Sequence, residues 1–171
     1  FIARADAGEP RLKIRPVSVN SLLRAACADF SARADQNGIS LKLELGKKEV
    51  MVMGDDGRLR QVFSILIDNA LRYSSRDGSV TVSLGVSGKE IVVRVKDTGI
   101  GLTAEEVRQA FQRFFRGGKA QSHARGTGLG LPVAKAIVEA HKGRITLEGN
   151  PGEGALASVF LPAEAKLRAV A

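Results

Sequence analysis

The sequence predicts an α/β sandwich with helices packed on one face of a sheet. Two observations predict this fold class. Segments in which every second residue is apolar, typical of half-buried strands, alternate with segments in which apolar residues recur every three or four positions, typical of helices. Glycines cluster between these segments, where the chain must turn. At 171 residues, 44% of them hydrophobic, the chain can form one domain with a buried core.

The first third of the chain is predicted to contain three short strands and one helix. Residues 14–19 are expected to form the first strand, and residues 21–37 a helix that ends at Gly38. Residues 41–45 alternate leucines with a lysine and a glutamate, which is typical of a half-buried strand. Another short strand is expected at residues 50–53.

The middle of the chain is predicted to contain an amphipathic helix and a hairpin. Asp55 or Asp56 can cap the helix. Apolar residues alternate over 80–86 and over 91–95, on either side of a turn at 87–88, which predicts two antiparallel strands. The helix buries one face, because its apolar residues recur at spacings of three and four: Leu59, Val62, Phe63, Leu66, Ile67, Ala70 and Leu71.

The last third of the chain contains an unusually long connection. A helix is predicted over 103–111, and about fifteen residues rich in Gly, Arg and Ser follow it, a length that usually has a functional reason. Pro132 falls in the first turn of a final helix that stops at Gly143. Strands at 145–147 and 157–161 complete the predicted fold.

Composition narrows the classes of partner. The net charge of +8 favours anionic partners. However, only 5% of the residues are aromatic and none is Trp, so few side chains are available to stack on the bases of single-stranded nucleic acid. The basic residues are dispersed and no nucleic-acid reading motif is present, so nucleic-acid binding is the more distant alternative and no nucleic acid is expected as a partner. A polyphosphate ligand suits the charge as well.

The expected location is the cytoplasm. No apolar run approaches the roughly 18 to 20 residues that span a bilayer, no signal peptide opens the chain, and the single cysteine, Cys27, fits a reducing compartment. The chain begins at Phe1 rather than Met, so we expect a piece of a longer protein, whose other parts could be anchored in a membrane.

Asn69 interrupts the amphipathic helix at the margin of its apolar face, beside Ile65, Arg72 and Tyr73. Asn is a poor residue for a helix interior, and its carbonyl oxygen is a hard ligand suited to a magnesium ion that also bridges phosphates. Taken alone, the residue could equally be a surface or capping amide.

Asp97 continues the inward phase of the strand over 91–95, so alternation directs its carboxylate toward the core. A carboxylate there can accept a hydrogen bond from the exocyclic amine of adenine, whereas guanine presents an acceptor at that position. The glycines that follow, Gly99 and Gly101, would let the backbone turn and a ring approach closely. An isolated Asp-x-Gly-x-Gly could instead simply start a turn.

A second glycine-rich segment, 126–131, runs directly into the helix that contains Pro132. Unpaired backbone N–H groups and the positive end of the helix dipole make such a junction an anion site suited to phosphates. The segment is neither a dinucleotide-binding fingerprint, because no βαβ unit surrounds it, nor a Walker loop, because no Gly-Lys-Ser/Thr occurs.

Arg113 and Arg116 flank two phenylalanines, Phe114 and Phe115, just before this segment. The phenylalanines could dock a lid on the core while an arginine reaches a terminal phosphate, although a charge run is usually a solvated face. The remaining candidates are given structural interpretations, because none has metal-ligand spacing or a catalytic partner: His123 in the loop, His141 at a helix C-terminus, and Cys27 in the core.

Together and in this order, the motifs resemble the histidine kinase branch of the fold shared by gyrase, heat-shock chaperones and mismatch-repair ATPases. Residues 61–74 (QVFSILIDNALRYS) resemble the N box, 97–101 the first glycine box, and 126–131 the second glycine box. Phe111, Phe114 and Arg116 resemble the F box. The resemblance implies a two-layer α/β sandwich of the Bergerat type, in which three main helices cover one face of a mixed, mostly antiparallel sheet of about five main strands.

The resemblance implies ATP and Mg²⁺ as ligands and a role for each matched residue. Asn69, Arg72 and Arg116 would be the catalytic residues: Asn69 would hold the metal, while Arg72 and Arg116 would contact phosphates. Tyr73 would contact the flank of the nucleotide, and Asp97 would read adenine. The other expected ligand contacts come from the two glycine boxes: Gly99, Ile100, Gly101 and Leu102 from the first, and Gly126, Thr127, Gly128, Leu129, Gly130 and Leu131 from the second.

The implied activity is transfer of the ATP γ-phosphoryl group to a histidine on a dimerisation domain that this chain lacks, because no His-Glu-x-x-Arg/Lys-Thr-Pro motif occurs. The expected partners are that dimerisation domain and the receiver domain of a response regulator, within a homodimeric parent. Residues 1–14 would end the dimerisation helix and its linker, 15–163 would form the catalytic domain, and 164–171 a tail.

Ile65 departs from the family pattern, which carries a second Asn there, and the related ATPases carry a glutamate that activates water. The departure argues against efficient ATP hydrolysis and leaves open a non-catalytic, degenerate nucleotide-binding module. Three smaller departures, which packing can accommodate, are Phe115 for a common Tyr, Lys142 for a common Gly, and Ala155 for a common Thr or Ser.

Overall fold

The computed structural model describes residues 11–118 and 127–163. Its centre is a five-stranded sheet in the order β2 (Ser40–Glu44), β4 (Ser79–Ser87), β5 (Glu90–Asp97), β7 (Ala155–Pro162) and β6 (Arg144–Gly149). The β2–β4 pair is parallel and the other three pairs are antiparallel, so the sheet is mixed and mostly antiparallel as expected.

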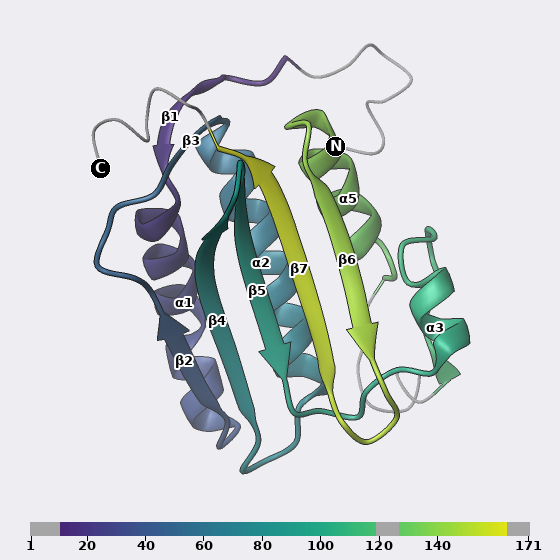
Figure 1. Ribbon diagram of the computed structural model, residues 1–171. Helices are drawn as coiled ribbons and strands as arrows, with labels where there is room; N and C mark the ends of the chain where they lie inside the picture. The colour runs from purple at the N-terminus through teal and green to yellow at the C-terminus, as the bar shows by residue number, and fades with distance from the viewer. Residues whose placement is uncertain (1–10, 119–126, 164–171) are drawn as a thin grey trace.

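Three long helices cover one face of this sheet: α1 (Val19–Gln36), α2 (Asp56–Tyr73) and α5 (Gly130–Ala140). All three lie behind the strands in Figure 1, and the short helix α3 (Ala104–Gln109) lies beside β6. The predicted two-layer sandwich with three main helices on one face is confirmed.

The smaller sheet pairs β1 (Arg15–Ser18) with β3 (Met51–Gly54), antiparallel. It lies at one end of the main sheet, where α1 begins (Figure 1). Ser18 caps α1 by accepting a hydrogen bond from the backbone N–H of Ser21 at 3.0 Å. This cap explains why α1 begins at residue 19, two residues earlier than predicted.

The core lies between the helices and the sheet. The apolar stripe predicted for α2 is buried as expected, and Phe63 and Ile67 are both fully inaccessible to solvent. The sheet contributes the inward residues of β4 and β5, among them Val82 and Val93. Burial of this apolar surface is the main favourable contribution to folding.

His141 joins the end of α5 to the start of α2. Its Nε2 accepts a hydrogen bond from the backbone N–H of Asp55 at 2.9 Å, and its Nδ1 lies 2.8 Å from the carbonyl oxygen of Ile137. Because an amide can only donate and a carbonyl can only accept, the ring is neutral with its proton on Nδ1. The buried His141 thus has the structural role expected of it, linking two helix ends through hydrogen bonds, and Asp55 itself caps α2.

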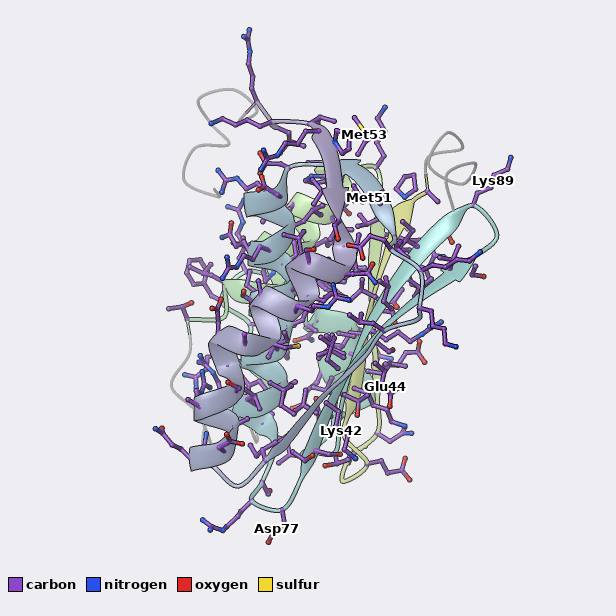
Figure 2. All side chains as sticks on the ribbon, turned by 90° about the vertical axis from the view of Figure 1, so that its left-hand side faces the viewer. Lys42, Glu44, Met51, Met53, Asp77 and Lys89 are labelled. Atoms are coloured by element: carbon purple, nitrogen blue, oxygen red, sulfur yellow. The ribbon has the colours of Figure 1, made fainter. Side chains whose placement is uncertain are left out.

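Charged side chains mark the outer edge of the main sheet. Lys42 and Glu44 lie on β2, and Figure 2 shows both from that side of the molecule. Lysine and other charges on an edge strand discourage pairing with strands of other molecules. Among residues 11–118 and 127–163, no helix combines the length and apolar character needed to cross a membrane.

The proposed division of the chain at residues 14 and 163 stays a prediction. Residues 11–14 precede β1 without regular secondary structure, and Pro162 ends β7. Residues 1–10, within the expected end of the dimerisation helix and its linker, and the expected tail 164–171 lie outside the described residues.

Lys142, where the resembled family has glycine, adopts a left-handed backbone with a φ of 59°. Replacing Lys142 by glycine should stabilise the domain by about 1 kcal/mol, because a left-handed L-residue costs roughly that much. Thermal or urea unfolding measures the difference. Lys135→Gly, inside α5, is the matched control and should instead destabilise by about 1 kcal/mol. A loss of stability in Lys142→Gly would contradict the prediction.

Candidate functional site

A cavity of about 440 Å³ lies between α2, the ends of β5 and β7, and the start of α5. Residues from all four motifs line it, including Asn69 from α2 and Asp97 from β5. The other predicted site residues on its wall are Arg72, Tyr73, Ile100, Gly101, Leu102, Arg116, Thr127, Gly128, Gly130 and Leu131. Gly99 and Leu129 are not among the lining residues, and Gly126 lies outside the described residues.

Asp97 is the acidic residue at the sheet side of the cavity, and its side chain is buried, as strand alternation predicted. Its Oδ1 accepts hydrogen bonds from the backbone N–H of Gly99 at 2.8 Å and of Ala155 at 3.2 Å. The described residues donate no further hydrogen bond to this carboxylate, so Oδ2 remains available to a ligand. Burial raises the pKa of Asp97, while the two backbone hydrogen bonds partly oppose that rise.

The first glycine box is fixed by the backbones that cross it. The N–H of Ile100 donates to the carbonyl of Tyr73 at 3.1 Å, and the carbonyl of Ile100 accepts from Gly152 at 2.8 Å. A Cβ on Gly99 would lie 2.2 Å from the Tyr73 oxygen, and one on Gly101 would lie 1.8 Å from the Asn150 oxygen. The missing side chains at Gly99 and Gly101 therefore make room for neighbouring backbone, and the close approach of a ligand ring to these glycines stays a prediction.

Asn69 lies on α2 at the margin of the buried stripe, as the helical spacing predicted, and is half-buried. Its side-chain amide makes no hydrogen bond with the described residues, although it lines the cavity. A half-buried amide oxygen on a cavity wall fits a hard cation. Ile65, one turn earlier, also lines the cavity and presents an apolar side chain there.

The second glycine box ends at the N-terminus of α5, which begins at Gly130. Leu129 is the N-cap residue, and no side chain caps the helix in the described part of the chain. The first N–H groups of α5 therefore lack side-chain acceptors, and Thr127 and Gly128 lie beside them on the cavity wall. Backbone donors and a helix dipole at this position suit an anionic group.

The F box packs against the second glycine box through the backbone. The N–H of Phe114 donates to the carbonyl of Gly128 at 3.0 Å, and a Cβ on Gly128 would lie 2.8 Å from the Phe114 carbonyl carbon. Phe115 and Arg116 line the cavity, but Phe114 is 72% exposed with a φ of 63°. The expectation that Phe114 docks on the core is wrong, because this left-handed residue turns its ring toward solvent.

Sequence reasoning missed two acidic residues on the cavity wall, Asp68 and Glu106. Thr103 and Glu106 form a capping box at the start of α3, where a helix was predicted. Asp68 offered no signal in the sequence, because Arg33, one of the two arginines that it contacts, comes from a helix distant in sequence. No cluster of three or more His, Cys, Asp or Glu residues suited to a metal occurs in the part of the chain that the structure describes.

A family model described as "Histidine kinase-, DNA gyrase B-, and HSP90-like ATPase" matches residues 54–165, which include all four motifs. The chain belongs to this family. The match begins at the end of β3 and therefore leaves out β1, α1 and β2.

The relatives of this ATPase domain are histidine kinases. The cell-division control histidine kinase PdhS of Brucella canis is 32% identical over 94% of this chain and 16% of PdhS. A catalytic domain of the histidine kinase ThkA superposes with a TM-score of 0.78 at 26% identity, over 88% of this chain and 96% of that one. Full-length ShkA in complex with AMPPNP superposes with a TM-score of 0.81 at 29% identity, over 98% of this chain and 35% of ShkA. The chain thus spans only a small part of PdhS.

The ATPase domain should become more stable when Asp97 is replaced by asparagine. A raised carboxyl pKa in the folded state means that holding the ionised group costs stability at pH values above the ordinary carboxyl pKa. Asparagine keeps an oxygen for the two amides and should raise the free energy of unfolding at pH 7 by about 1 kcal/mol. Urea unfolding at several pH values is the measurement, and the gain should shrink as pH falls and the wild-type carboxylate protonates.

An equal gain at every pH would show that the carboxylate charge is not its cause. Asp77→Asn is the control, because Asp77 is exposed in the turn before β4, where Figure 2 shows it. This exposed substitution should leave stability within about 0.5 kcal/mol of the wild type.

Proposed function

We propose that this chain is the ATP-binding catalytic domain of a sensor histidine kinase, which transfers the γ-phosphoryl group of ATP to a histidine on a dimerisation domain. The observation that carries the proposal is that Asp97 and Asn69, from different layers of the fold, line one cavity. A carboxylate that can bind the adenine base and an amide that can bind a metal ion can thereby contact the same nucleotide.

Asp97 supplies adenine selectivity. Its carboxylate oxygen accepts a hydrogen bond from the exocyclic amine of adenine, while the carbonyl oxygen of guanine would face a second acceptor. Leaving two buried acceptors in contact costs binding free energy, which excludes guanine more strongly than a missing contact would. Apolar side chains on the same wall, among them Ile100 and Leu131, suit the faces of the ring.

The phosphates are proposed to lie at the N-terminus of α5, with Thr127 and Gly128 beside them. Arg72 and Arg116 add positive charge on the cavity wall. Asn69 fits as the protein ligand of a Mg²⁺ ion, which when bound would neutralise phosphate charge, and water and phosphate oxygens would supply the remaining ligands. Positioning and charge neutralisation account for most of the catalysis of phosphoryl transfer.

The comparisons support this proposal by analogy. The solved ShkA structure contains AMPPNP, and PdhS and ThkA are both described as histidine kinases. By analogy with them, the partners are the dimerisation domain of the same kinase and the receiver domain of a response regulator, within a homodimeric parent whose catalytic domain faces the cytoplasm.

Ile65 favours a second candidate function, a degenerate module that binds nucleotide without catalysis. Its side chain reaches the cavity wall, and its Cγ2 would lie 3.2 Å from a Cβ on Gly130. An apolar group there supplies neither a metal ligand nor a base. Incubation with labelled ATP and a purified dimerisation domain separates the candidates, because a degenerate module leaves the histidine unlabelled while a kinase labels it.

Asp97→Asn should weaken ATP binding by more than about tenfold, because the amide offers a different donor pattern to adenine. Isothermal titration calorimetry of the 171-residue chain with ATP and Mg²⁺ measures the change. Asp77→Asn, the exposed control, should bind as the wild type does. Wild-type affinity in Asp97→Asn would remove the assignment of Asp97 to adenine.

Asn69→Ala should specifically weaken the magnesium-dependent part of ATP binding, because it removes the amide ligand. Calorimetry with and without Mg²⁺ gives that part as a ratio of two dissociation constants. Asn37→Ala removes an exposed amide at the end of α1 and should leave the ratio unchanged. An unchanged ratio in Asn69→Ala would show that the metal is held elsewhere.

A further inference from the structure

Asp68 connects α1 to the cavity through two arginines. Its Oδ1 accepts a hydrogen bond from Nη1 of Arg33 on α1 at 2.5 Å, and its Oδ2 accepts one from Nη2 of Arg72 on α2 at 2.6 Å. The side chain of Asp68 is 25% exposed and that of Arg72 is 26% exposed, so this contact is better shielded from water than an ordinary surface ion pair. Both residues also line the cavity.

The order of the side chains around α2 places Arg72 between Asp68 and Asn69. At about 100° per residue, Asp68 lies roughly 40° to one side of Arg72, and Asn69 lies roughly 60° to the other. The Asp68 side faces α1, since Arg33 reaches it from there. Arg72 is thus held from the side opposite to the proposed metal ligand.

The charges of the three groups explain why two arginines are present. A lone carboxylate beside Arg72 would cancel its positive charge and repel a triphosphate. Arg33 offsets the charge of Asp68, so the group of three keeps a net charge of +1 beside the cavity. The carboxylate can then restrain Arg72 without making the wall neutral.

We propose that Asp68, itself held by Arg33, is a positioning residue that orients the guanidinium of Arg72 toward the phosphates of ATP. A free arginine side chain has many rotamers, and fixing one of them before the ligand arrives reduces the entropy lost on binding. Nη2 of Arg72 donates to Asp68, and a guanidinium carries its five N–H donors in a planar fork that matches the geometry of phosphate oxygens. The inference rests on the proposed function, since it requires ATP in the cavity.

The test compares a ligand that has phosphates with one that has none. Asp68→Asn in the 171-residue chain raises the net charge of this group from +1 to +2 but frees the guanidinium of Arg72 from its restraint. It should therefore weaken Mg²⁺–ATP binding by about tenfold and change adenosine binding by less than about twofold. Tighter ATP binding would show that charge outweighs orientation and would overturn the proposal. Calorimetry measures ATP binding, and an NMR titration measures adenosine binding. A purely structural effect on the cavity would weaken both ligands together.

Asp29→Asn is the matched control, because Asp29 also pairs α1 with an arginine of α2. The distance from Asp29 Oδ2 to Nη2 of Arg60 is 2.5 Å, but neither residue lines the cavity. This variant should bind both ligands as the wild type does. If Asp29→Asn weakened ATP binding as much as Asp68→Asn does, the proposal would be overturned. The loss would then follow from breaking any ion pair between α1 and α2.

Arg33 gives a second, independent pair of variants that applies even if Asp68→Asn does not fold. Arg33→Ala leaves Asp68 paired with Arg72 alone, so the two charges cancel, and should weaken ATP binding about fivefold without affecting adenosine binding. Arg33→Lys restores the positive charge and should restore most of the affinity. An equal loss in both variants would overturn the charge argument.

The failure of the inference differs from that of the proposed function. If the wild-type chain binds neither ATP nor adenosine, the proposed nucleotide-binding function is wrong and the inference fails with it. If the wild type prefers ATP over adenosine and Asp68→Asn keeps the same preference, only the positioning role of Asp68 is overturned.

Discussion

The carboxylate of Asp97 is held by two backbone amides, one from Gly99 just after β5 and one from Ala155 at the start of β7. Both amides bond to the same oxygen, so a single side chain joins two strand ends and still presents its second oxygen to the cavity. Burying an ionised group without a cationic partner costs stability. The two backbone hydrogen bonds offset part of that cost, so the ends of β5 and β7 must be positioned to make them.

Near Asp97 the position of the cavity wall is fixed by contacts between backbone segments. The first glycine box crosses the end of α2 and the turn between β6 and β7 at distances that exclude a Cβ at Gly99 and Gly101. Interlocked backbones of this kind resist rearrangement, because any shift of one segment breaks hydrogen bonds in another. The part of the wall that contains Arg72 and Arg116 is different, since its positive charge is carried by long side chains.

Periodicity was enough to predict most of the strands, the buried face of α2 and the inward direction of Asp97, because local spacing determines which face a residue occupies. The exposure of Phe114 could not be predicted in this way, because its left-handed backbone depends on its contact with Gly128 in another segment. The packing of Gly99 against Tyr73 could not be predicted either, since the end of α2 that crosses Gly99 is not visible in a local pattern. Asp68 was missed for a related reason, because the arginine that compensates its charge comes from α1.

Because β2 pairs with β4 in parallel, α1 and β2 join the rest of the fold through contacts that are distant in sequence. Parallel neighbours need a crossover, and here the intervening chain includes β3 and all of α2. The antiparallel strands β4 and β5 pair locally, whereas α1 and β2 join through contacts distant in sequence, which carry a larger loop-closure cost. Loss of α1 would therefore detach Arg33 from Asp68 without directly breaking the two hydrogen bonds of Asp97, because those bonds belong to the ends of β5 and β7.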